Sequence, residues 1–149
     1  MLTIAPATPS DLTDMMSLLG QLFAQEAEFS PDPAAQARGL QMILDAPDTG
    51  LLLIAREGPV AVGMVGLLFT VSTALGARVA LLEDMVVTAG LRNAGAGSAL
   101  LQEALRQARA AGCKRVTLLT DDINTAAQRF YARHGFVPSP MLPLRCLLD

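Results

Sequence analysis

The fold of this chain is decided by the stretch from Leu82 to Ser98, which reads LEDMVVTAGLRNAGAGS. Its first half is rich in Val, Leu and Met, as in a buried strand. Its second half is rich in glycine and alanine and leads into a helix predicted from Gly95 to Ala111. The first backbone N–H groups of such a helix have no partner within it, and the helix dipole favours negative charge there. The stretch therefore predicts a strand, a loop and a helix N-terminus that can receive an anion.

This helix start has no anion of its own. Two other predicted helices begin beside acidic residues, whereas this one has none before Glu103. Gly95 and Gly97 lack side chains that would keep a phosphate from the backbone, and Arg92 adds a positive charge just upstream. The pattern favours an external anion such as a pyrophosphate. The alternative is that the glycines only make a tight turn and that Ser98 caps the helix.

The rest of the chain alternates strand and helix patterns around this stretch. Strands are predicted at residues 2–6, 51–56, 60–70, 79–87 and 115–120, helices at 12–23, 34–44, 95–111 and 123–134, and a last extended stretch at 136–148. Because a helix separates the strands at 79–87 and 115–120, we expect these two strands to be parallel neighbours. The order predicts one mixed α/β domain over residues 1–149.

Composition excludes several classes of protein. The chain is 52% hydrophobic and 17% charged, which excludes a disordered protein. A net charge of −3 argues against a nucleic-acid partner, which would require a clustered basic face. The 20 uncharged positions from Gly58 to Ala77 could span a membrane by length, but a Gly-Pro turn and further glycines predict hairpin strands instead.

The two cysteines, Cys113 and Cys146, have no metal-ligand spacing, so no metal site is predicted. Reduced thiols and the lack of a secretory signal pattern lead us to expect a cytoplasmic protein.

Two motifs resemble those of the GCN5-related N-acetyltransferase (GNAT) family. Arg92-x-x-Gly95-x-Gly97 matches the family's [Gln/Arg]-x-x-Gly-x-[Gly/Ala] motif, and Asn124-x6-Tyr131-x3-Gly135-Phe136 resembles its second motif. The two stand in the family's order, about 30 residues apart. The likeness extends over nearly the whole chain. It implies a GNAT-like acyltransferase fold, an α/β mixed sheet of about seven strands with four helices.

The resemblance implies acetyl-CoA as the cofactor, bound between the fourth and fifth strands. Its pyrophosphate would lie on the backbone of residues 92–98, and its pantetheine arm would pair with residues 85–87. The N–H of Met85 would polarise the thioester carbonyl. The implied cofactor-binding residues are Met85, Val86, Val87, Arg92, Asn93, Ala94, Gly95, Ala96, Gly97, Ser98 and Asn124.

The resemblance also points to catalytic side chains. Tyr131 matches the family's usual general acid, which protonates the departing thiolate; the alternative is a packed aromatic residue. Glu83 stands in a Leu-Glu-Asp-Met run similar to that of diamine acetyltransferases, where this glutamate is a candidate base; the alternative is a structural salt bridge. Glu26, Glu28 and Asp32 fall in the family's substrate-side loop, where they would attract a cationic amine or form a solvated acidic edge.

The resemblance thus implies an N-acetyltransferase that moves an acetyl group from acetyl-CoA to a primary amine of a small molecule or a protein. Direct attack in a ternary complex is expected, because neither cysteine lies in a motif for an acyl-enzyme. The alternative is a non-catalytic acyl-CoA-binding or regulatory module with the same fold. The excess of apolar residues is consistent with a homodimer, as in many relatives.

Overall fold

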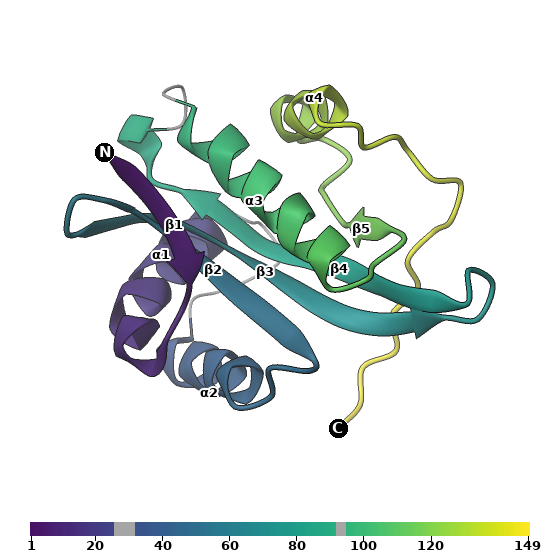
Figure 1. Ribbon diagram of the computed structural model, residues 1–149, viewed down its shortest axis with the longest axis horizontal. Coiled ribbons are helices and arrows are strands. Elements are labelled where there is room, and N and C mark those ends of the chain that lie inside the picture. Colours follow the sequence, from purple (N-terminus) through teal and green to yellow (C-terminus); the bar gives the residue numbers. More distant parts are fainter. Residues whose placement is uncertain (26–31, 92–94) are drawn as a thin grey trace. The chain divides into compact units, whose positions relative to one another are not determined.

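The computed structural model describes residues 1–25, 32–91 and 95–149 (Figure 1). These residues form two compact parts, Met1–Leu119 and Thr120–Asp149, and each is described by itself below. The expectation of one domain over residues 1–149 stays a prediction.

The first part contains a five-stranded mixed sheet. Its strands are β1 (Leu2–Pro6), β2 (Gly50–Glu57), β3 (Val60–Ser72), β4 (Ala77–Val87) and β5 (Val116–Leu118), in the spatial order β1-β2-β3-β4-β5. The pairs from β1 to β4 are antiparallel, and β5 is parallel to β4. The expected parallel pairing across the long helix is therefore confirmed.

Within the first part, helices cover both faces of this sheet (Figure 1). The helices are α1 (Leu12–Gln25), α2 (Pro33–Leu44), α3 (Ala96–Ala110) and, in the second part, α4 (Thr125–Arg133), with short 3₁₀ turns at Pro9–Asp11 and Ala89–Leu91. Met64 of β3 belongs to a buried cluster with residues of α1 and α2, whereas its neighbour Gly63 faces Leu100 of α3. Successive residues of a strand point to opposite faces, so α1 and α2 lie on one face and α3 on the other. The mixed α/β class with four helices is confirmed.

The uncharged run from Gly58 to Ala77 contains β3, which pairs with β2 on one side and β4 on the other. The hairpin interpretation is confirmed, and the high apolar content follows from strands covered on both faces. No helix in the described part of the chain is long and apolar enough to cross a membrane.

The expected strand count of about seven is wrong, since the described residues form five strands. Residues 137–149 contain no strand. Three prolines in this segment, at positions 138, 140 and 143, lack the N–H that a sheet ladder requires. Its apolar side chains are also exposed, with Leu144 at 94% and Leu148 at 90%, so burial does not favour a strand there.

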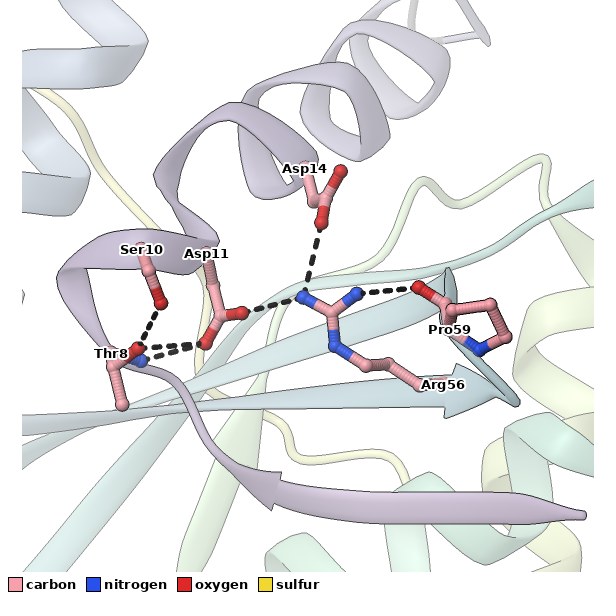
Figure 2. Close-up of polar contacts among 6 residues, drawn as sticks. All are labelled: Thr8, Ser10, Asp11, Asp14, Arg56 and Pro59. Carbon is pink, nitrogen blue, oxygen red and sulfur yellow. Dashed lines mark hydrogen bonds and ion pairs between the residues drawn. The ribbon is translucent and has the colours of Figure 1, made fainter.

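Arg56 of β2 ties the start of α1 to the sheet (Figure 2). Its Nη2 donates to Asp11 Oδ1 at 2.5 Å and to Asp14 Oδ2 at 3.0 Å, and its Nη1 donates to the Pro59 carbonyl at 3.1 Å. Asp11 Oδ2 also accepts from the Thr8 N–H at 2.8 Å. Burial alone would raise the pKa of Asp11, but these hydrogen bonds and the charge of Arg56 outweigh it and lower the pKa. The network fixes the N-terminal end of α1.

Candidate functional site

The centre of the candidate site is a break in the pairing of β3 with β4. Met64 pairs with Val86, whereas Gly66 pairs with Glu83, so that two residues of β4, Asp84 and Met85, oppose one residue of β3. This arrangement is a β-bulge, which bends a strand and re-aims its side chains. Asp84 has φ +54°, and no other non-glycine residue in the described ranges has a positive φ. Aspartate and asparagine tolerate this conformation better than other non-glycine residues.

The other edge of β4 is only partly covered. β5 pairs with β4 at Ala80, Leu81 and Leu82 and no further. Over the part of the chain that the structure describes, no strand pairs with residues 83–87 on the β5 side. An edge of this kind presents backbone N–H and C=O groups that an extended, amide-containing ligand can pair with. The three residues predicted to meet the pantetheine arm, 85–87, lie on this edge.

The helix that follows β4 begins without a side-chain cap. The N-cap of α3 is Gly95, at φ +85°, and the first turn contains no acidic residue. The Ala99 N–H donates to the Gly95 carbonyl at 3.0 Å, so the amides of Ala96 and Gly97 precede the first bond within the helix. Ser98 stands inside the helix and is not its N-cap.

Several predicted residues lie outside the described part of the chain. They are Arg92, Asn93 and Ala94 of the phosphate-binding motif, and Glu26 and Glu28 of the substrate-side loop.

A pocket of about 330 Å³ lies between α1, α2 and the bulge of β4. Its apolar walls come from Leu19 and Phe23 of α1 and from Leu40 and Ile43 of α2. α1 and α2 cover the face of the sheet to which Val86 points, and Asp84, two residues before Val86, lines the pocket on this face. The pocket is therefore an apolar cavity that opens on the break in β4.

Asp84 is the carboxylate of β4 that lines this pocket. Burial and, to a smaller extent, the charge of the adjacent Glu83 raise its pKa from 3.8 to about 6. Above pH 6 the Asp84 carboxylate is a poorly solvated negative charge in the pocket, and such a charge favours the binding of a cation. The sequence singled out Glu83 and missed Asp84. The acidic pair inside an apolar run was the available signal, but only the packing of α1 and α2 on one face of the sheet shows which of the two lines the pocket.

Two further polar residues line the pocket, both from the α2 region. Asp32 Oδ1 accepts from the Ala35 N–H at 3.1 Å and caps α2, which supports the structural interpretation of this residue. Gln36 is only 9% exposed, and its Nε2 has no hydrogen-bond partner. The sequence did not single out Gln36, because its position among alanines near a helix start carries no functional signal.

The second part of the chain carries the other predicted residues. Asn124 Oδ1 accepts from the Ala127 N–H at 3.1 Å and caps α4. The ring of Tyr131 packs edge-on against Phe130 and Phe136, at centroid distances of 5.2 and 5.6 Å. Burial raises the pKa of Tyr131 to about 12, so its phenol is protonated at neutral pH. Tyr131 is thus a packed aromatic residue that keeps a proton to donate.

Comparison with known proteins decides the family. Residues 13–136 match the Acetyltransferase (GNAT) family. The chain belongs to the GNAT family. Among curated proteins it is 31% identical over 127 residues to the uncharacterized N-acetyltransferase YhfO of Bacillus subtilis (strain 168), and the alignment covers 83% of this chain and 85% of that protein.

Solved structures show the same fold. A protein of Bacillus halodurans C-125, described as a transcriptional regulator, is 27% identical with a TM-score of 0.82, over 99% of this chain and 100% of that one. A predicted acetyltransferase of Clostridium acetobutylicum, solved with acetyl-CoA, is 17% identical with a TM-score of 0.81, over 97% of this chain and 96% of that one. The second likeness shows the fold alone. The resemblance to the GNAT family seen in the motifs is confirmed.

Proposed function

We propose that this GNAT chain is an acetyl-CoA-dependent N-acetyltransferase that acetylates a primary amine by direct attack in a ternary complex. One observation carries the proposal: β5 covers the edge of β4 only as far as Leu82, and β4 leads, within one segment, to the N-terminus of α3, which has no side-chain cap. The homologous N-acetyltransferase and the acetyl-CoA in a protein of the same fold support this assignment.

The described residues fit acetyl-CoA. Its amide-containing arm suits the backbone groups of β4 residues 83–87, and its phosphates suit the amides of Ala96 and Gly97. A Cβ at Gly95 would meet no atom of the described residues within 4 Å. When bound, acetyl-CoA supplies an acetyl thioester that an amine can attack.

Each proposed residue then has one task. The Met85 N–H holds the thioester carbonyl and stabilises the negative charge that develops on its oxygen. Glu83 is the proposed proton acceptor, directly or through a water molecule, for the attacking amine. Tyr131 is the proposed general acid, and its phenolic proton would go to the departing thiolate. The other residues that we propose for cofactor binding are Val86, Val87, Arg92, Asn93, Ala94, Ser98 and Asn124.

The test of this function is an activity assay with purified protein, acetyl-CoA and a panel of primary amines. Because Cys113 and Cys146 are free thiols that would react with a thiol reagent, the acetylated amine is best measured directly by mass spectrometry. We expect product only when both acetyl-CoA and an amine are present. Binding of acetyl-CoA without acetylation of any amine would instead support the non-catalytic module.

The phosphate-binding role of α3 has a matched control at the other end of the helix. Gly95 and Gly112 have φ of +85° and +86°, and a Cβ added at either would meet no atom of the described residues within 4 Å. Glutamate at either position therefore causes the same backbone strain, but only Gly95→Glu places a carboxylate beside the helix N-terminus. We expect Gly95→Glu to weaken acetyl-CoA binding at least tenfold relative to Gly112→Glu. Equal affinities in calorimetry would remove the α3 N-terminus from the cofactor site.

The role of Tyr131 is tested by Tyr131→Phe, which keeps the ring against Phe130 and Phe136 and removes only the hydroxyl. We expect kcat to fall by about 10²-fold or more, with little change in acetyl-CoA affinity. An unaltered kcat would leave Tyr131 with its packing role alone.

A further inference from the structure

Four basic residues gather at the end of the sheet where β4 begins. Arg78 is the second residue of β4, Arg109 lies in the last turn of α3, and Lys114 and Arg115 directly precede β5. The Lys114 N–H donates to the Arg78 carbonyl at 2.9 Å, and the Arg115 carbonyl accepts from the Ala80 N–H at 2.9 Å, so these backbone segments are adjacent. Only four residues separate Arg109 from Lys114. These four basic residues are called the basic end below.

The positive charge of the basic end is not neutralised within the described residues. None of its four side chains takes part in an ion pair there, and all of them except Arg78 are exposed. The hairpin of β3 and β4 contains no acidic residue before Glu83. The one acidic residue of α3, Glu103, is paired with Arg106. The basic end is therefore a local concentration of positive charge on a chain whose net charge is −3.

Arg78 lies beside apolar side chains that are not fully covered. Its guanidinium carbon stands 4.9 Å from the centroid of the Phe69 ring, and this cation–π contact limits the motion of the guanidinium. Arg78 is also the cross-strand partner of Val71, which is 71% exposed, so the two side chains lie on one face of the hairpin. β2 pairs with β3 only as far as Leu68, and this end of the hairpin therefore extends beyond β2. The surface combines an oriented cation with an exposed apolar residue.

The chemistry of this surface favours a short acidic protein segment. Guanidinium groups bind carboxylates through paired hydrogen bonds, and an apolar side chain between the carboxylates would cover Val71. The net charge is −3 although the basic end is positive, so the rest of the chain is more strongly negative. A nucleic acid or a membrane surface would extend over that acidic remainder and be repelled by it, whereas a short segment contacts the basic end alone.

We propose that the basic end, together with Phe69 and Val71, is a docking surface for a short acidic segment of a partner protein that carries an apolar side chain between its carboxylates. This inference goes beyond the proposed acetyl transfer. None of the six residues belongs to the proposed cofactor-binding or catalytic residues, and all six lie in the part of the chain from Met1 to Leu119.

The test is calorimetric binding of a synthetic peptide, Glu-Glu-Leu-Glu-Glu-Leu-Glu-Glu, to the full chain. The variant that tests the charge carries Lys114→Gln and Arg115→Gln together, and its control is Arg38→Glu, at an exposed position of α2. Both proteins lose two units of net charge, but only the first loses them at the basic end. We expect the double variant to bind the peptide about fivefold or more weakly than the wild-type protein, and Arg38→Glu to bind it within about twofold. Equal weakening in both variants, or a wild-type protein that does not bind the peptide, would overturn the proposal.

The apolar part of the surface has a matched control on the same strand. Val71 is 71% exposed near one end of β3, and Val60 is 59% exposed at the other. We expect Val71→Ser to weaken binding of the peptide about threefold or more, because the leucine side chain loses an apolar contact, and Val60→Ser to leave the affinity unchanged. The same affinity in both variants would show that charge alone attracts the peptide and would overturn the role of Val71. Unchanged melting temperatures would confirm that each variant is folded.

Two further measurements distinguish other occupants of this surface. An oligonucleotide of uridines is titrated into the same proteins, and tighter binding than that of the peptide, lost in the double variant, would assign the surface to a nucleic acid and overturn the proposal. Sedimentation velocity of the wild-type protein and the double variant tests a second copy of this chain. A wild-type dimer that becomes a monomer in the double variant would place a second copy on the surface and would also overturn the proposal. An equal sedimentation coefficient for the two proteins, with peptide binding lost in the variant, would support it.

Discussion

The buried carboxyl of Asp84 should make the protein less stable as the pH rises from 4 to 6. The folded-state pKa is about 6, above the ordinary value of 3.8, so in this interval the folded chain binds more protons than the unfolded chain. Stability therefore falls with rising pH, and the full cost of the buried charge is present above pH 6. Below pH 3.8 the Asp84 carboxyl is mostly protonated in both the folded and the unfolded chain, so the destabilisation by its charge disappears.

The substitution that isolates this effect is Asp84→Asn. Asparagine has the shape of aspartate, tolerates the φ of +54° and carries no charge. A tenfold change in an ionisation equilibrium is worth about 1.4 kcal/mol, so a pKa of about 6 in place of 3.8 corresponds to about 3 kcal/mol at most. Because the side chain is only partly buried, solvent screening reduces this value. We expect the variant to exceed the wild-type protein in free energy of unfolding by about 1–3 kcal/mol at pH 7.5.

The assay is urea unfolding followed by circular dichroism at pH 7.5 and 3.5. Circular dichroism is the suitable probe because the chain has no tryptophan and one tyrosine. The difference in free energy of unfolding between Asp84→Asn and the wild-type protein should be large at pH 7.5 and close to zero at pH 3.5. The control is Asp48→Asn, at an exposed turn position, for which we expect the same difference at both pH values. A difference that is the same at both pH values would refute the argument, since it would come from packing and not from charge.

Three further substitutions test the packing of the sheet and its helices by urea unfolding. Arg56→Gln removes the guanidinium that satisfies Asp11, whose side chain is 14% exposed, and should lower the free energy of unfolding by about 1–3 kcal/mol. Gly63→Ala places a Cβ at 3.0 Å from the Val86 carbonyl and should lower it by about 1–3 kcal/mol, because backbone cannot move aside without disturbing the ladder. Gly20 lies in the middle of α1, and a Cβ added there would meet no atom of the described residues within 4 Å. Gly20→Ala should therefore raise the free energy of unfolding by up to about 1 kcal/mol, because alanine has the higher helix propensity. Opposite signs for the two alanine variants are expected, and equal signs would contradict the packing argument.

Local patterns in the sequence were sufficient to predict most of the first part of the chain. The helix from Ala96 to Ala110 follows from its apolar spacing, and Gly112, at φ +86°, ends it as expected. The parallel pairing of β4 with β5 follows from the intervening helix, because crossover connections obey a general rule of handedness. These features depend on residues close together in the chain.

The strands expected after residue 136 show where local patterns mislead. Apolar residues there are typical of a strand, but strand formation requires a partner edge and backbone N–H groups. The described residues 137–149 include three prolines and form no strand. Whether an apolar segment becomes a strand is decided by pairing with distant residues.

By itself the sequence determined the family, the order of the main helices and strands, and the glycine-rich start of α3, because each depends on motifs or on periodicity within a short segment. Only the tertiary structure decided that Asp84, and not Glu83, lines the pocket, since the pocket is formed by α1 and α2 packing on one face of the sheet. Only packing of α2 against α1 and the sheet makes Gln36 a buried donor without a partner. The burial of a side chain and the register of a strand are set by how two elements pack or pair. The most specific features of this site therefore depend on contacts between residues far apart in the chain.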